Sequence, residues 1–72
     1  MFNFLTVHLE STDPHLFRHL SESVYIKREG SRVSYWCDTG LFWLNEVEQA
    51  QAHAERVKRK GLKTSIISRT LT

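Results

Sequence analysis

The sequence predicts a small α+β domain in which one antiparallel sheet carries one main helix on one of its faces. Four segments have the alternation or the β-forming residues that are typical of strands, at residues 2–9, 23–28, 32–37 and 62–70. A longer helical pattern begins at Asn45, and a shorter one covers residues 14–20. The resulting order of β, short α, β, β, α, β is that of a ferredoxin-like plait, and a β-β-β-α-β sheet covered by one helix is the alternative.

The N-terminal half of the chain contains the first strand, the short helix and a hairpin. The odd-numbered residues from Leu5 to Leu9 are apolar and are expected to face the core, with the even-numbered residues on the other side. Asp13 suits the cap of the short helix, and Pro14 suits its first position. Gly30 separates the second and third strands, where its freedom to adopt a positive φ favours a tight hairpin.

The main helix has signals at both ends. Asn45 is the predicted N-cap, because the acid Glu48 follows three residues later. Basic residues lie at the negative end of the helix dipole, and Gly61 is the predicted residue just past the C-terminus. A narrow apolar stripe of mostly small residues lets the helix lie close to the sheet, and it consists of Val47, Ala50, Ala54 and Val57.

The composition is that of a single domain, residues 1–72, which we expect to be soluble and cytoplasmic. A 72-residue chain buries only about 60% of its unfolded surface, so a metal or a partner often stabilises domains of this size. Cys37 is the only cysteine, which excludes an intrachain disulfide. The sequence starts without the features of a signal peptide, and no apolar run approaches the roughly 20 residues of a membrane span.

Charge is distributed unevenly along the chain, although the net charge is only +2. Residues 1–55 hold four Lys or Arg and eight acids, whereas residues 56–72 hold six Lys or Arg and no acid. Such a basic end either attracts an anionic partner or is a solvated helix terminus. The candidate anion or nucleic-acid contacts are Arg56, Lys58, Arg59, Lys60 and Lys63.

The tripeptide Asp38-Thr39-Gly40 matches the active-site motif of aspartic proteases, but its surroundings do not. Protease chemistry needs two carboxylates about 3 Å apart that share one proton, and one copy per chain suffices only in a symmetric dimer. A helix predicted from Asn45 does not suit an essentially all-β protease. We expect instead that Asp38 and Gly40 turn the chain out of a strand. The residues that then enter the core are Leu41, Phe42 and Leu44.

The histidines and the cysteine form no convincing metal or catalytic set. His15 and His19 share one face of the short helix, and Cys37 or His53 could complete a metal site with them. No Cys-x-x-Cys or His-Glu-x-x-His motif accompanies the pair, so surface histidines are the favoured interpretation. Cys37 is expected to be an inert core thiol, with His8 as the best base available to it. We therefore predict no catalytic residue, no metal and no cofactor.

The strongest functional signal is a mixture of aromatic and basic side chains on one face of the hairpin. If the apolar hairpin residues face the helix, the opposite face of the sheet presents these side chains to solvent. Open sheets of this kind stack bases in RNA-binding domains, although the RNP1 pattern is absent here. Trp, Tyr and Arg also dominate protein interfaces. The candidate partner-binding residues are Phe4, Tyr25, Lys27, Arg32 and Trp36.

We predict from this face a non-enzymatic binding protein, such as a stand-alone regulator or inhibitor that contacts another protein. Binding of single-stranded nucleic acid through the same face and the basic helix end is the alternative, and its affinity would fall steeply with salt. A second copy of the chain is a further candidate partner, because soluble monomers rarely leave a sizeable apolar patch uncovered. The sequence resembles no family that we recognise.

Overall fold

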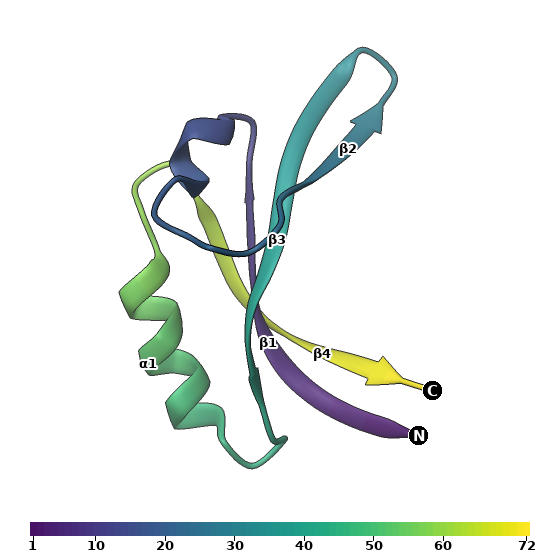
Figure 1. Cartoon of the computed structure of the whole chain (residues 1–72), viewed down its shortest axis with the longest axis vertical. Helices are drawn as coiled ribbons and strands as arrows, with labels where there is room; N and C mark the ends of the chain where they lie inside the picture. The colour runs from purple at the N-terminus through teal and green to yellow at the C-terminus, as the bar shows by residue number, and fades with distance from the viewer.

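The computed structural model describes residues 1–72 as one four-stranded antiparallel sheet with a single α-helix (Figure 1). The α+β class is therefore confirmed, and of the two predicted arrangements the β-β-β-α-β order is the one observed. A short 3-10 helix, η1 (Pro14–Phe17), interrupts the path from the first strand to the second. The elements of the sheet and its helix are β1 (Phe2–Ser11), β2 (Tyr25–Glu29), β3 (Arg32–Phe42), α1 (Val47–Val57) and β4 (Lys63–Leu71).

The strand order is β2-β3-β1-β4, and every neighbouring pair is antiparallel. In this order β1 and β2 are parallel with β3 between them, and β3 and β4 are parallel with β1 between them. The chain therefore makes two interleaved crossovers. Helix α1 forms the second crossover, whereas the first contains only η1 and irregular chain.

The predicted helix over residues 14–20 is wrong beyond its first turn. The N-terminal signals work as expected, because the Asp13 carboxylate accepts a hydrogen bond from the backbone N–H of His15 and Pro14 starts the turn. The helix nevertheless ends at Phe17. Phe17 is its only buried residue, so too little apolar surface is removed from water to extend so short a helix.

Strand β3 continues five residues beyond its predicted end at Cys37, so the expectation that Asp38 and Gly40 leave the strand is wrong. The register with β1 shifts between the pair Val7–Thr39 and the pair Leu5–Phe42, which marks a β-bulge. Gly40 adopts a φ of +76° inside this bulge. The Thr6 hydroxyl donates toward the carbonyls of Thr39 and Gly40, at 3.0 and 2.9 Å, and holds the bulge against β1.

Both predicted ends of the main helix need correction. The N-cap is Glu46 and not Asn45, and no side chain caps the first turn. The Glu46 carboxylate reaches back and accepts a 2.7 Å hydrogen bond from the backbone N–H of Trp43. The helix ends at Val57, and Gly61, with a φ of +89°, lies instead in the turn that leads into β4.

Helix α1 packs on β1, β3 and β4, and the core lies between them. The apolar core cluster is small and consists of Val7, Leu9, Phe17, Cys37, Val57 and Leu62. Phe42 packs against it as predicted, but Leu41 and Leu44 are exposed, because the bulge and the turn before α1 direct them outward. All five residues of β2 are exposed, so the hairpin extends beyond the core.

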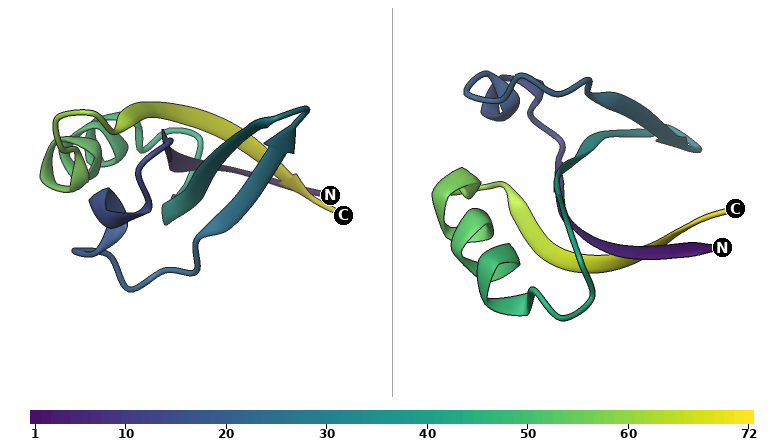
Figure 2. Two further views of the ribbon diagram at one scale, coloured as in Figure 1. Left: turned by 90° about the horizontal axis from the view of Figure 1, so that it is seen from above. Right: turned by 60° about the horizontal axis from the view of Figure 1, so that its bottom comes forward.

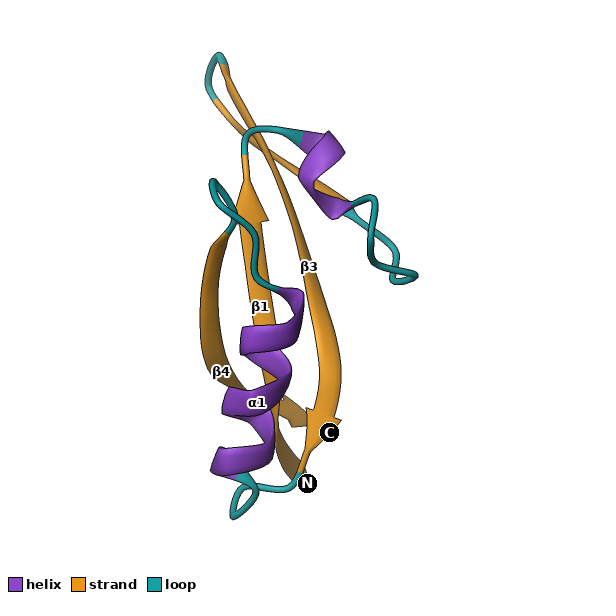
Figure 3. Ribbon diagram, turned by 90° about the vertical axis from the view of Figure 1, so that its left-hand side faces the viewer, coloured by secondary structure: helices purple, strands orange, loops and turns teal.

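The sheet is curved, and its uncovered face lies on the inside of the curve. Figure 2 shows the β2–β3 hairpin and the terminal ends of β1 and β4 bending away from α1 toward the same side. Figure 3 shows α1 on the opposite side, in front of the central strands. No helix of the chain is long and apolar enough to cross a membrane.

Candidate functional site

The sheet face opposite α1, called the open face below, is formed by alternate residues of all four strands. Facing residues in antiparallel strands project to the same side, so the register fixes its membership. Tyr25 faces Trp36, Lys27 faces Ser34, and His8 faces Asp38. The open face comprises Phe2, Phe4, Thr6, His8, Glu10, Tyr25, Lys27, Glu29, Arg32, Ser34, Trp36, Asp38, Lys63, Ser65, Ile67, Arg69 and Leu71.

Trp36 and Tyr25 form the centre of the open face at the base of the hairpin. Their rings are stacked, with centroids 4.8 Å apart and an interplanar angle of 30°. The His8 ring lies 5.5 Å from the Trp36 ring on the neighbouring strand, and the Arg69 guanidinium lies 5.8 Å from the centroid of the indole. Tyr25 is 53% exposed and Trp36 is half-buried, so the pair offers a flat aromatic surface to a partner.

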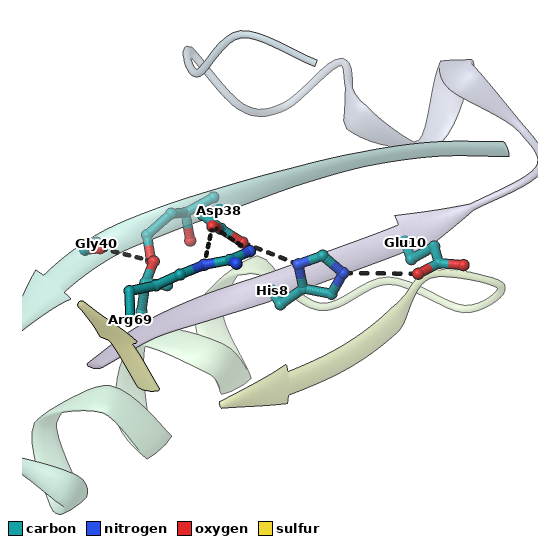
Figure 4. Close-up of polar contacts among 7 residues, drawn as sticks. His8, Glu10, Asp38, Gly40 and Arg69 are labelled. Atoms are coloured by element: carbon teal, nitrogen blue, oxygen red, sulfur yellow. Dashed lines mark hydrogen bonds and ion pairs between the residues drawn. The ribbon is translucent and has the colours of Figure 1, made fainter. Parts of the chain in front are cut away.

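Asp38 organises the polar part of the open face (Figure 4). Its Oδ1 accepts a 2.8 Å hydrogen bond from His8 Nδ1, and its Oδ2 accepts from Nε and Nη2 of Arg69 at 3.0 and 2.9 Å. On the other side of the imidazole, Nε2 lies 3.5 Å from the Glu10 carboxylate. The Asp38 carboxylate therefore holds Arg69 against the indole of Trp36, and its acceptor oxygens are both engaged.

Phe4 shares the open face but belongs to a second aromatic group at the far end of β1. Its ring stacks on Phe2 with centroids 5.5 Å apart, and Phe2 meets the edge of Trp43 at 5.2 Å. Trp43 is 59% exposed. The predicted partner-binding residues thus share one face, on which the Phe4 ring stacks on Phe2 and Phe4 faces Arg69 in the strand register.

Lys27 and Arg32 lie toward the tip of the hairpin, and both are exposed. Lys27 Nζ lies 3.5 Å from the Glu29 carboxylate, and Arg32 faces Glu29 in the strand register. Each predicted cation of the hairpin therefore has an acid as its neighbour on the same face.

Most of the predicted anion-binding residues do not join the open face. Lys63 is the exception, and it faces Glu10 across the sheet. Lys58 pairs with Glu55, and Arg59 donates hydrogen bonds to the carbonyls of Arg56 and Lys58 at 3.2 and 2.7 Å. Arg59 thereby covers free carbonyls at the helix terminus, a structural role. The cluster of Arg56, Lys58, Arg59 and Lys60 lies at the end of α1, on the covered side of the sheet.

Cys37 is fully buried in the core, as expected. Burial, together with the Glu22 and Asp38 carboxylates, raises the pKa of its thiol from 9.0 to about 11. The thiol is therefore protonated at neutral pH and is a poor nucleophile. Of the predicted histidine pair, His19 is engaged by its Nε2, which donates a 2.7 Å hydrogen bond to the carbonyl of Val57. The side chains form no cluster of three or more potential metal ligands.

Sequence reasoning missed two contributors to the site. Asp38 alternates with Trp36 and so belongs to the same face, a signal that the protease-like tripeptide obscured. Arg69 joins it through the pairing of β1 with β4, which local sequence does not reveal. Comparison with protein-family models, with curated proteins and with solved structures finds no match to the chain.

Proposed function

We propose that the chain is a non-enzymatic, cytoplasmic binding protein, a regulator or inhibitor that contacts another protein through the open face. The observation that carries this proposal is the exposed stack of Tyr25 on Trp36, with Arg69 held beside it by Asp38. Rigid aromatic and guanidinium groups are the side chains that supply most of the binding energy at protein interfaces. Ordering them in the free protein lowers the entropy lost on binding.

The charges of the open face favour a protein over a nucleic acid. Its cations have acids beside them. Lys27 pairs with Glu29, Arg69 pairs with Asp38, and Lys63 faces Glu10 in the strand register. Phosphate binding depends on cations that are free to replace counterions. The aromatic rings are accessible for base stacking, but the basic end of α1 lies on the other side of the sheet. A mixed, balanced surface with an aromatic centre suits a protein partner.

The proposal is tested by comparing affinity capture from lysate between the wild type and three variants. Tyr25→Ala and Trp36→Ala remove the aromatic centre, whereas Trp43→Ala removes a more exposed tryptophan from the far aromatic group. The expected partner is retained by the wild type and by Trp43→Ala in moderate salt and after nuclease treatment. It is lost with Tyr25→Ala and with Trp36→Ala.

Two controls make the outcome decisive. Far-UV CD and urea unfolding establish that each variant is folded, and Tyr25→Ala serves if Trp36→Ala is not, because the Tyr25 side chain is more exposed. Fluorescence anisotropy of labelled single-stranded RNA and DNA at low and moderate salt measures the alternative. Salt-sensitive nucleic-acid binding that depends on Trp36 would identify the partner of the open face as a nucleic acid. A capture profile that neither Tyr25→Ala nor Trp36→Ala changes would refute the use of the open face.

A further inference from the structure

Three stretches of at least five residues have no neighbouring strand on one side. β2 is an edge strand, β4 is the opposite edge, and residues 37–42 of β3 pair only with β1. Unpaired strand edges recruit other strands unless charges, bulges or short length protect them. β2 is protected, because it has only five residues and carries Lys27 and Arg28. The free part of β3 is interrupted by the bulge at Gly40.

The β4 edge is longer and less protected, although it also carries two cations. β4 has nine residues in an unbroken register with β1, from Lys63 opposite Glu10 to Leu71 opposite Phe2. It contains no glycine, no proline and no bulge, and its two cations lie at positions 63 and 69. Its central segment, Thr64–Ser68, is neutral and includes two isoleucines. Figure 3 shows β4 at the margin of the sheet, with β1 on its inner side and no strand on its outer side.

We propose that a second copy of the chain binds this edge, with the two β4 strands antiparallel about a two-fold axis at Ile67. Ile67 is the middle residue of β4, so this register pairs the whole strand. The two sheets then form one continuous eight-stranded sheet, with both α1 helices on the same side. The contact is isologous, which closes the assembly as a dimer.

The positions of the two cations distinguish this register from the one centred on Ile66. With the axis at Ile67, Ser65 faces Arg69 of the other copy and Lys63 faces Leu71, so no like charges meet. With the axis at Ile66, Lys63 would face Arg69, and two directly opposed cations destabilise a strand pair.

A hollow beside the same edge supports a second copy as the occupant. It has a volume of about 480 Å³ and lies between α1 and β4, with Ala54, Glu55, Lys58 and Ile66 among its lining residues. In the dimer the two hollows lie on the same side of the sheet, one on each side of the axis, with the two copies of the lining residue Ser65 about 14 Å apart. The added burial also supplements a core of only six clustered residues.

Sedimentation equilibrium of the full chain over a wide concentration range tests the dimer. The wild type is expected to dimerise. Ile67→Lys places two ammonium groups opposite each other at the axis and is expected to be monomeric with a native CD spectrum. Ile26→Lys adds the same charge at the β2 edge, where Ile26 is 54% exposed, and is expected to dimerise like the wild type.

Cysteine cross-linking tests the register without relying on a destabilising charge. Ile67→Cys brings two identical positions to about 5 Å between Cα atoms, within the range of a disulfide. Ser65→Cys, on the same strand and face, leaves its two copies about 14 Å apart at 3.4 Å per residue, too far to cross-link. Mild oxidation is therefore expected to link only Ile67→Cys, and the buried thiol of Cys37 does not compete.

Several results would overturn the proposal. A wild type that stays monomeric up to its solubility limit excludes the dimer. If both cysteine variants cross-link equally, the contact lies on another surface. The same follows if Ile26→Lys dissociates the dimer and Ile67→Lys does not. The interface uses the β4 residues of the open face, Arg69 among them, but neither Tyr25 nor Trp36, so the capture experiment on those two residues can succeed or fail independently.

Discussion

Replacing Gly40 with alanine is expected to remove about 2–5 kcal/mol from the free energy of unfolding. Gly40 has a φ of +76°, where a non-glycine residue costs about 1–2 kcal/mol. An added Cβ would also lie 2.6 Å from Cε2 of the Phe42 ring and 3.1 Å from Cδ2 of His53. The ring has to move by most of an ångström inside packed structure, and such overpacking costs about 1–3 kcal/mol.

This loss is large for so small a domain. At about 0.05–0.15 kcal/mol per residue, 72 residues correspond to a total stability of about 4–11 kcal/mol. Urea unfolding followed by far-UV CD measures the difference, with the slope m checked for constancy. At constant m, we expect the midpoint of Gly40→Ala to fall by at least about a fifth relative to the wild type.

Gly30→Ala is the matched control. Gly30 also has a positive φ, of +63°, but an added Cβ there meets no atom within 4 Å. Its expected cost is about 1 kcal/mol, from the backbone alone. In a Phe42→Leu background the extra cost of Gly40→Ala should shrink, because the clashing ring is gone. Equal costs for the two glycines, or no dependence on Phe42, would refute the packed bulge.

Three further predictions concern the helix entry, the polar network and the thiol. Glu46→Ala should lower the free energy of unfolding by about 1 kcal/mol through loss of the bond to the Trp43 N–H, whereas Asn45→Ala should leave the urea midpoint unchanged; the reverse result would restore Asn45 as the cap. Asp38→Asn should cost about 1–2 kcal/mol, since the carboxylate accepts from both His8 and Arg69. Glu29→Gln, which breaks the exposed pair with Lys27, should cost less than about 0.5 kcal/mol, and similar costs for the two variants would contradict the network. Above pH 9.0 the unfolded chain loses the Cys37 proton that the folded chain keeps to about pH 11. The wild type should therefore lose stability relative to Cys37→Ala between these pH values, and parallel urea-midpoint profiles for the two proteins would argue against the raised pKa.

The open face shows which contacts the local sequence patterns predict in this protein and which they do not. A two-residue period placed Tyr25, Lys27, Arg32 and Trp36 on one side of the hairpin, and the structure has them there. The same period assigns Asp38 to that side, but its partners His8 and Arg69 are 30 and 31 residues away in the chain. Such contacts follow from strand order, which alternation within one strand does not encode.

Several parts of the molecule follow from residues that are close together in the chain. These are the four strands with their inward and outward sides, the tight turn at Gly30 and the helix with its buried Ala50 and Val57. Each rests on backbone geometry or on a repeat of two or 3.6 residues, which a single segment carries in full.

The ends of those elements and the contacts between them depend instead on segments that are far apart in the chain. The bulge at Gly40 exists because β3 pairs with β1, and Thr6 of β1 holds it. The segment 14–20, expected to be helical, forms only the single turn η1, because Phe17 is the only residue of that turn that is buried. β4 became an open edge because β1 pairs with it on one side alone. In each case the deciding energy is burial or hydrogen bonding between segments far apart in the chain, which no local pattern contains.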